Sequence, residues 1–128
     1  MAVEDLNHVN INAPQPLLDQ LRDFYVAVIG LKEGWRPPVP IPGYWLYAGD
    51  KPLVHLMDAS PMPGHQRQPQ PAGHLDHIAF SCTDATGMEA RLRAAGIPYR
   101  RNDTREFGIV QLVVTDPAGL DVELNISD

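Results

Sequence analysis

The chain has little of what several classes of protein depend on. Cys82 is its only cysteine, so no disulfide can form within the chain, and this composition fits a reducing compartment. No apolar run of about 18 residues is present that could span a membrane. Residues 1–5 show no basic stretch leading into an apolar one, as a secretion signal would. We therefore expect a cytoplasmic protein that has no membrane partner.

Positive charge is scarce as well. Lys and Arg number 10 against 16 Asp and Glu, which gives a formal net charge of −6. Arg100, Arg101 and Arg105 form the only basic cluster, and two acidic neighbours, Asp103 and Glu106, dilute it. Without a basic segment the chain is not expected to bind nucleic acid. Apolar residues make up 44% of the 128 residues, enough for a single globular domain with its own core.

An internal repeat is the most informative feature that the sequence does contain. Residues 6–11, LNHVNI, return as residues 75–80, LDHIAF. Residues 54–56, VHL, return as residues 122–124, VEL. A repeat of this length indicates a duplicated supersecondary unit, here of about 70 residues.

The repeat predicts an α+β fold with the order βαβββ in each half. In the first half we expect strands at 6–11, 44–49 and 53–57, a helix from Pro14 to Gly30, and a proline-rich loop or edge segment at 36–43. In the second half we expect strands at 75–81, 97–101, 108–115 and 120–126, a helix capped by Thr83 or Asp84 and ended by Gly96, and a loop at 102–107.

A linker separates the two halves. Residues 59–73 are rich in Pro, Gly and Gln, which divides the chain into a first module, 1–58, and a second module, 74–128. A half of about 65 residues has too little core to be stable alone. We therefore expect the two halves to pack together or to exchange across a dimer.

The repeat also places metal-ligand side chains at equivalent positions. His77 follows His8 by 69 residues, and Glu123 follows His55 by 68. His55 and Glu123 each lie between two apolar residues, and because strand side chains alternate, both point away from the apolar face. Imidazole and carboxylate donors suit Zn, Fe, Mn, Co or Ni. We predict that His8, His55, His77 and Glu123 converge on one divalent metal that keeps positions open for a substrate.

Weaker candidates line the predicted pocket. Trp45 and Gln111 are related by an offset of 66 residues and are expected to face the site. Arg36 either pairs with a substrate anion or lies in a solvated loop. The full set of predicted pocket residues is Arg36, Tyr44, Trp45, Tyr47, Phe107 and Gln111.

These residues together resemble the vicinal oxygen chelate superfamily, which includes glyoxalase I, methylmalonyl-CoA epimerase, extradiol dioxygenases, fosfomycin-modifying enzymes and bleomycin-binding proteins. The resemblance covers essentially the whole chain and is carried by residues 7–9, 24–31, 75–80, 116–119 and 122–124. It implies two βαβββ modules that form a curved mixed sheet around a central metal. It also implies a small-molecule substrate that chelates the metal through adjacent oxygens, and a homodimer.

The resemblance leaves the reaction open among three alternatives. A glyoxalase-like isomerase or lyase is the first, an extradiol-type iron dioxygenase the second, and a metal-free, bleomycin-resistance-like binding protein the third. His8, His77 and Glu123 look like the two-His, one-carboxylate triad of extradiol dioxygenases and fosfomycin thiol transferases, whereas glyoxalase I has Glu where this chain has His55. His55 is a fourth ligand or a general acid/base, and Glu123 a ligand that also acts as a base.

Overall fold

The computed structural model of the protein describes residues 1–64, 74–104 and 108–127. The chain divides into two compact units, Met1–Gln68 and Pro69–Asp128. Their boundary falls within the proline-rich stretch 59–73 of the sequence. Within the described ranges, no helix has both the length and the apolar character needed to cross a membrane.

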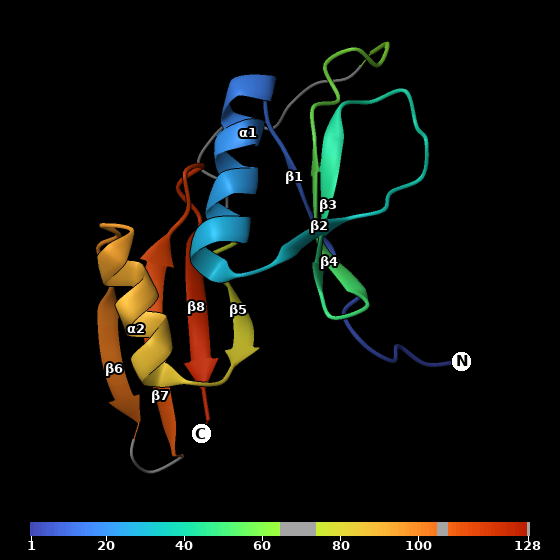
Figure 1. The fold of residues 1–128 in the computed structure, drawn as a ribbon. Coiled ribbons are helices and arrows are strands. Elements are labelled where there is room, and N and C mark those ends of the chain that lie inside the picture. The colour runs from blue at the N-terminus through green and yellow to red at the C-terminus, as the bar shows by residue number, and fades with distance from the viewer. Residues whose placement is uncertain (65–73, 105–107, 128) are drawn as a thin grey trace. The chain divides into compact units, whose positions relative to one another are not determined.

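The first unit is a four-stranded mixed sheet with one helical segment. Strand β1 pairs in parallel with β4, and β3 pairs antiparallel with both β4 and β2, which gives the order β1-β4-β3-β2. The sheet and its helix are drawn in blue to green in Figure 1. The elements are β1 (Val9–Asn12), α1 (Gln15–Asp23), the π-helix η1 (Phe24–Ile29), β2 (Lys32–Gly34), β3 (Gly43–Ala48) and β4 (Lys51–Met57).

The second unit repeats this topology. Strand β5 pairs in parallel with β8, and β7 pairs antiparallel with both β8 and β6, so that the order β5-β8-β7-β6 matches the first unit strand for strand (Figure 1). The predicted α+β class and the order βαβββ are therefore confirmed. The elements are β5 (His77–Cys82), α2 (Ala85–Ala94), β6 (Arg100–Thr104), β7 (Ile109–Thr115) and β8 (Asp121–Ile126).

The strand register confirms one offset of the repeat and corrects another. Trp45 lies opposite His55, and Val113 lies opposite Glu123, as the offset of 68 residues requires. The counterpart of Trp45 is therefore Val113. The expected equivalence of Trp45 and Gln111 is wrong, because Gln111 pairs with Asn125, which lies two residues beyond Glu123 on the same face of β8.

Buried apolar residues alternate with the predicted site residues along the central strands. Val54 and Leu56 flank His55 and are 0% and 1% exposed, and the residues that flank Glu123 are fully buried too. Burying each such side chain stabilises the fold by about 1.5–3 kcal/mol. This alternation fixes the strand's rotation and directs the intervening polar side chain to the opposite face.

The helices follow their sequence signals, with two differences. Leu21 is buried as its helical spacing predicts, whereas Leu18 is buried where the spacing predicted Leu17, which is half-buried. Gly30 ends the helical segment with a positive φ of 100°. The last turns are a π-helix, in which the amide of Gly30 donates to the carbonyl of Tyr25 over 3.1 Å. In the second unit, Asp84 caps α2 through its carboxylate, which accepts from the amide of Gly87.

Several strand boundaries differ from the expected ones. Strand β1 begins at Val9, so His8 lies immediately before the strand that was expected to contain it. Strand β2 lies ahead of the proline-rich segment 36–43, and its three exposed residues exist as a strand only by pairing with β3. Strand β6 begins three residues later than expected and extends into the predicted loop 102–107, whose residues 105–107 lie outside the described ranges.

Candidate functional site

In the first unit the two predicted histidine ligands lie in contact. The rings of His8 and His55 stack with their centroids 3.8 Å apart and their planes 12° from parallel. His8 comes from the segment before β1, and His55 from the middle of β4. Because β1 and β4 pair in parallel, with Asn10 opposite His55, residues 47 positions apart in sequence are brought together.

A neighbouring amide sets the tautomer of His8. The Nδ1 atom of His8 lies 2.7 Å from the side-chain oxygen of Asn7. An amide oxygen only accepts hydrogen bonds, so Nδ1 must carry the proton in this contact. The lone pair of the neutral ring is then on Nε2, which is the arrangement that a metal-binding histidine needs.

The imidazole of His55 is buried and has an unused nitrogen. His55 is 8% exposed, and its Nε2 has no hydrogen-bond partner. Burial lowers the pKa of His55, the nearby His8 lowers it further, and a hydrogen bond to the Pro52 backbone partly opposes them. The ring is therefore held neutral at pH 7 with a free lone pair. An orphaned buried nitrogen of this kind is costly unless something binds it.

Tryptophan covers the other face of His55. The Trp45 ring stacks on His55 with centroids 3.9 Å apart and planes 10° from parallel, so His55 lies between two flat rings. Trp35 meets Trp45 edge to face at 6.2 Å. The imidazole of His55 cannot rotate without displacing one of its neighbours. The two stacked rings therefore hold the orientation of His55, although its Nε2 has no hydrogen bond.

The second unit brings together the other predicted pair. Nε2 of His77 lies 3.7 Å from Oε2 of Glu123, and Nδ1 of His77 lies 2.8 Å from a carboxylate oxygen of Asp76. The hydrogen bond to Asp76 raises the pKa of His77, and the negative charge of Glu123 adds to the increase. A carboxylate on Nδ1 is the usual outer partner of a metal-binding histidine, because it leaves Nε2 to the metal.

Glu123 is itself held by a neighbour. The side-chain amide of Gln111 donates to Oε1 of Glu123 over 3.0 Å. Oε1 is therefore engaged, and Oε2 is the oxygen nearer to His77. On the same face of β8, the buried Oδ1 of Asn125 has no hydrogen-bond partner. This face of the second unit thus presents a carboxylate oxygen and an unused amide acceptor.

Each unit by itself supplies two of the four predicted ligands. Among the described residues, no group of three or more His, Cys, Asp or Glu lies together in a way that could hold a metal ion. The donors themselves suit a divalent cation. They are the unpartnered Nε2 of His55, the Nε2 atoms of His8 and His77, whose Nδ1 atoms are hydrogen-bonded to neighbours, and the carboxylate of Glu123. The site of four ligands stays a prediction.

Other predicted pocket residues have structural contacts of their own. The hydroxyl of Tyr44 donates to Asp19 of α1 over 2.7 Å, and this bond raises the pKa of Tyr44. The guanidinium of Arg36 donates to the carbonyl of Ile41 over 2.7 Å, which closes the proline-rich loop on itself. Tyr44 and Arg36 therefore stabilise the fold locally, and their contact with substrate stays a prediction. Phe107 lies outside the described residues.

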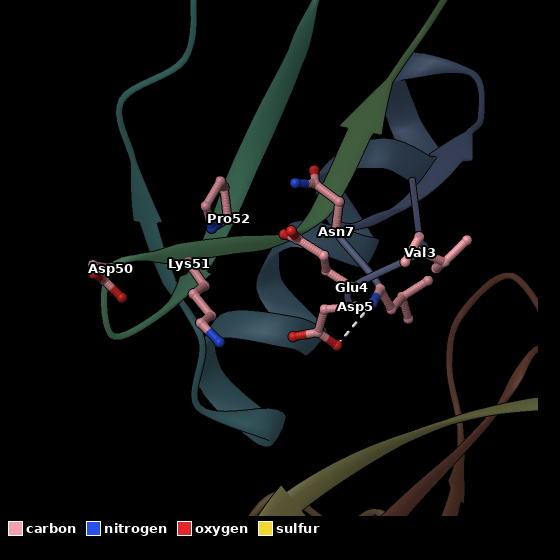
Figure 2. A pocket seen from close by; sticks show the side chains of 9 residues that line it. Val3, Glu4, Asp5, Asn7, Asp50, Lys51 and Pro52 are labelled. Atoms are coloured by element: carbon pink, nitrogen blue, oxygen red, sulfur yellow. Dashed lines mark hydrogen bonds between the residues drawn. The ribbon is translucent and has the colours of Figure 1, made fainter.

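A separate pocket of about 560 Å³ lies in the first unit, between the start of the chain and the turn that joins β3 to β4. Figure 2 shows the charged side chains of Glu4, Asp5, Asp50 and Lys51 around it. None of the predicted metal ligands lines this pocket. Two of its lining residues contact predicted ligands: Asn7 bonds to His8, and the backbone of Pro52 bonds to His55.

Asn7 and Asp76 contact predicted ligands and are absent from the set of site residues that the sequence predicted. Each directly precedes a predicted histidine ligand, and each accepts from Nδ1 of that histidine. The signal was present in the repeat, because both copies place an oxygen-bearing Asn or Asp before the histidine. Its meaning depended on the side-chain rotamers, which the sequence pattern does not show.

Comparison with known proteins identifies the family. The model of the Glyoxalase/Bleomycin resistance protein/Dioxygenase superfamily matches residues 5–124, and the chain belongs to this family. It is 32% identical over 125 residues to Glyoxylase I 4 of Arabidopsis thaliana, in an alignment that covers 93% of this chain and 68% of the relative.

Solved structures share the fold at lower identity. A glyoxalase family protein from Bacillus anthracis superposes with a TM-score of 0.78 at 22% identity, covering 100% of this chain and 98% of the other. An antibiotic binding protein from Streptomyces sp. CB03234 superposes with a TM-score of 0.71 at 20% identity, covering 100% and 99%. One fold therefore carries proteins of different function, and the function must be argued from the site.

Proposed function

We propose that the protein is a glyoxalase-like, metal-dependent enzyme of the isomerase or lyase type. Its substrate is a small molecule that chelates a divalent metal through two adjacent oxygens. His8, His55, His77 and Glu123 supply the protein ligands, with Asn7 and Asp76 orienting two of the histidines. The 32% identity to Glyoxylase I 4 supports this reaction class.

The unpartnered Nε2 of His55 is the observation that carries the proposal. A neutral imidazole with a buried, unused lone pair is costly in a protein that binds nothing there. The contact with His8 places a second available nitrogen beside it. The equivalent position in the second unit holds Glu123, which brings the negative charge that a divalent cation requires.

The chain's residues divide the chemistry between them. When bound, the metal supplies Lewis-acid polarisation of the chelated oxygens, which makes an adjacent C–H more acidic. Glu123 is the proton acceptor. Gln111 donates a hydrogen bond to its Oε1, so Oε2 is the oxygen that takes the proton. Asp76 keeps the Nδ1 proton of His77 in place, so His77 offers only Nε2. His55 excludes water from its side of the site by its stack with Trp45.

Metal content tests the ligand set. Purified wild type is expected to retain about one divalent ion per chain after dialysis, measured by elemental analysis, and the single variants His8→Ala, His77→Ala and Glu123→Gln are expected to lose it. His74→Ala is the matched control, since His74 is an exposed histidine outside the predicted set. A wild type that retains no metal, or variants that retain it, would contradict the proposal.

His55→Ala separates the two roles left open for this residue. Loss of the metal makes His55 a ligand, whereas loss of turnover with the metal retained makes it an acid/base group. Turnover is measured with the hemithioacetal of methylglyoxal and glutathione, and separately with catechols under air. Activity on catechols alone would favour the dioxygenase alternative, and a metal-free protein inactive on both would favour a binding protein.

We further propose a homodimer, and mixed variants test how it shares its ligands. One variant carries His8→Ala with His55→Ala, and the other His77→Ala with Glu123→Gln. If each site combines the histidine pair of one chain with His77 and Glu123 of the other, the mixed dimer has one intact site and regains metal binding. If each chain holds its own site, the mixed dimer has no intact site and does not regain metal binding. Light scattering measures the assembly independently.

A further inference from the structure

Both tryptophans of the chain lie in one cluster beside His55. Trp45 stacks on the His55 ring, and Trp35 meets Trp45 edge to face at a centroid distance of 6.2 Å. The chain has no other tryptophan. Trp45 is partly buried, whereas Trp35 is 70% exposed. Tryptophan is usually largely buried, so a tryptophan ring that is exposed to this extent beside a buried stack is unusual.

The backbone that carries Trp35 is held in place. The hydroxyl of Tyr47 donates to the carbonyl of Trp35 over 2.6 Å. The residue before it is Gly34, and a Cβ there would come within 2.7 Å of the Tyr47 ring, so a larger residue would displace the ring that holds Trp35. The pairing of Gly34 with Trp45 in the sheet adds a further restraint. Trp35 is therefore an exposed ring on a fixed support.

The loop that follows Trp35 is also restrained. Arg36 donates to the carbonyl of Ile41 and spans the proline-rich segment. The prolines themselves limit the backbone, because each fixes its own φ. A ring that is presented by a pre-organised support loses little conformational entropy when a ligand stacks on it.

We propose that Trp35 and Trp45 form a platform that binds a planar, unsaturated part of the substrate, beside the oxygens that chelate the metal. The inference rests on the proposed function, because His55 connects the platform to the predicted metal ligands. The edge-to-face arrangement leaves a face of Trp35 exposed, and a flat conjugated group stacks on such a face better than a saturated one of equal size. The platform thus selects for an aromatic or conjugated substituent.

Hydroxamates test the platform, because all of them chelate metals through the same two adjacent oxygens. Calorimetric titration of the metal-loaded protein compares benzohydroxamate with acetohydroxamate, and cyclohexanecarbohydroxamate controls for apolar area. We expect benzohydroxamate to bind about 3- to 10-fold more tightly than either of the others. Trp35→Ala should abolish that preference and leave the affinity for acetohydroxamate unchanged, and Trp35→Phe should restore most of it.

The outcomes separate this inference from the metal proposal. Equal affinities in the wild type, or a preference that survives Trp35→Ala, would overturn the platform while the metal site stands. A change of oligomeric state in Trp35→Ala would overturn it too, since the ring would then serve an interface. If no hydroxamate binds because no metal is held, metal-free protein is titrated with benzamide and acetamide. Tryptophan fluorescence should then saturate with benzamide alone, and its failure to do so would refute the platform.

Discussion

The two units have the same strand order and surround equivalent positions with opposite chemistry. In the first unit, burial and the neighbouring His8 lower the pKa of His55, which stays neutral between two rings. In the second unit, Asp76 raises the pKa of His77, and Glu123 at the position equivalent to His55 is a carboxylate held by Gln111. The duplication preserved the backbone and divided the electrostatic roles between its copies.

This division has a consequence for the proposed metal. The first unit supplies neutral nitrogen donors, and the second supplies the charge that compensates the cation. A protein in which both copies carried a carboxylate would place more negative charge around the same ion. Variants that truncate both copies alike, or that change one copy toward the other, test this difference, in order of decreasing expected effect on stability or binding.

The largest effect is expected from the equivalent core leucines. Leu56 and Leu124 are 1% and 0% exposed, and truncating each to alanine leaves a cavity in its own unit. We expect Leu56→Ala and Leu124→Ala each to lower the free energy of unfolding by about 2–5 kcal/mol, measured by urea denaturation. Leu75→Ala, at a residue that is 56% exposed, should change it by no more than about 0.5 kcal/mol. A large difference between the two core variants would mean that the copies are unequally packed.

The next effect comes from making the first unit resemble the second. His55→Glu puts a carboxylate between two rings with no hydrogen-bond partner at hand, so metal-free protein should lose about 3 kcal/mol of stability at pH 7. Burial raises the pKa of that carboxyl in the folded state, so the folded state binds more protons and the deficit should shrink as the pH falls toward 5.

Two controls sharpen the result of this exchange. His55→Gln is neutral and similar in size, and should cost clearly less than His55→Glu in the same denaturation experiment. Glu123→His, the reverse exchange, should also cost less, because the Glu123 side chain is 18% exposed. Equal losses for all three variants would show that packing, and not charge, decides the difference between the copies.

A smaller effect is expected when the support of His77 is changed to that of His8. Asp76→Asn gives the second unit the amide that the first unit already has in Asn7. We expect metal affinity to fall about 10-fold, at the lower end of the range for outer partners of metal ligands. Competition with a chromophoric chelator measures it, and Asp50→Asn, at an exposed turn, is the control. In metal-free protein, the same variant should lower the pKa of His77 in an NMR titration, because the charged ring loses its carboxylate partner.

The smallest effect concerns Cys82 in β5. Its counterpart in the first unit is Ala13, which is 3% exposed, so Cys82→Ala makes the copies alike at a position that tolerates a small residue. We expect a change of less than about 1 kcal/mol in unfolding free energy. Burial raises the pKa of the Cys82 thiol, so a disulfide reagent at pH 8 should modify it more slowly in the folded than in the urea-unfolded protein. Equal rates would contradict this.

Much of the fold could be predicted because its signals are local or repeated. The alternation around His55 and Glu123, the cap at Asp84 and the glycine at position 30 each lie within a few residues of the feature they determine. Strand β2 could not be predicted in the same way. Its three exposed residues have no pattern of their own and form a strand only through pairing with β3.

The sequence by itself determined the duplication, the order of the elements other than β2, and the identity of the four candidate ligands. These follow from the spacing of residue types, which the chain carries before it folds. Only the tertiary structure decided that His8 stacks on His55, that Trp45 covers the other face, and that Asn7, Asp76 and Gln111 hold the donors. Such contacts depend on strand register and on side-chain rotamers, and neither is encoded in the spacing of residues along the chain.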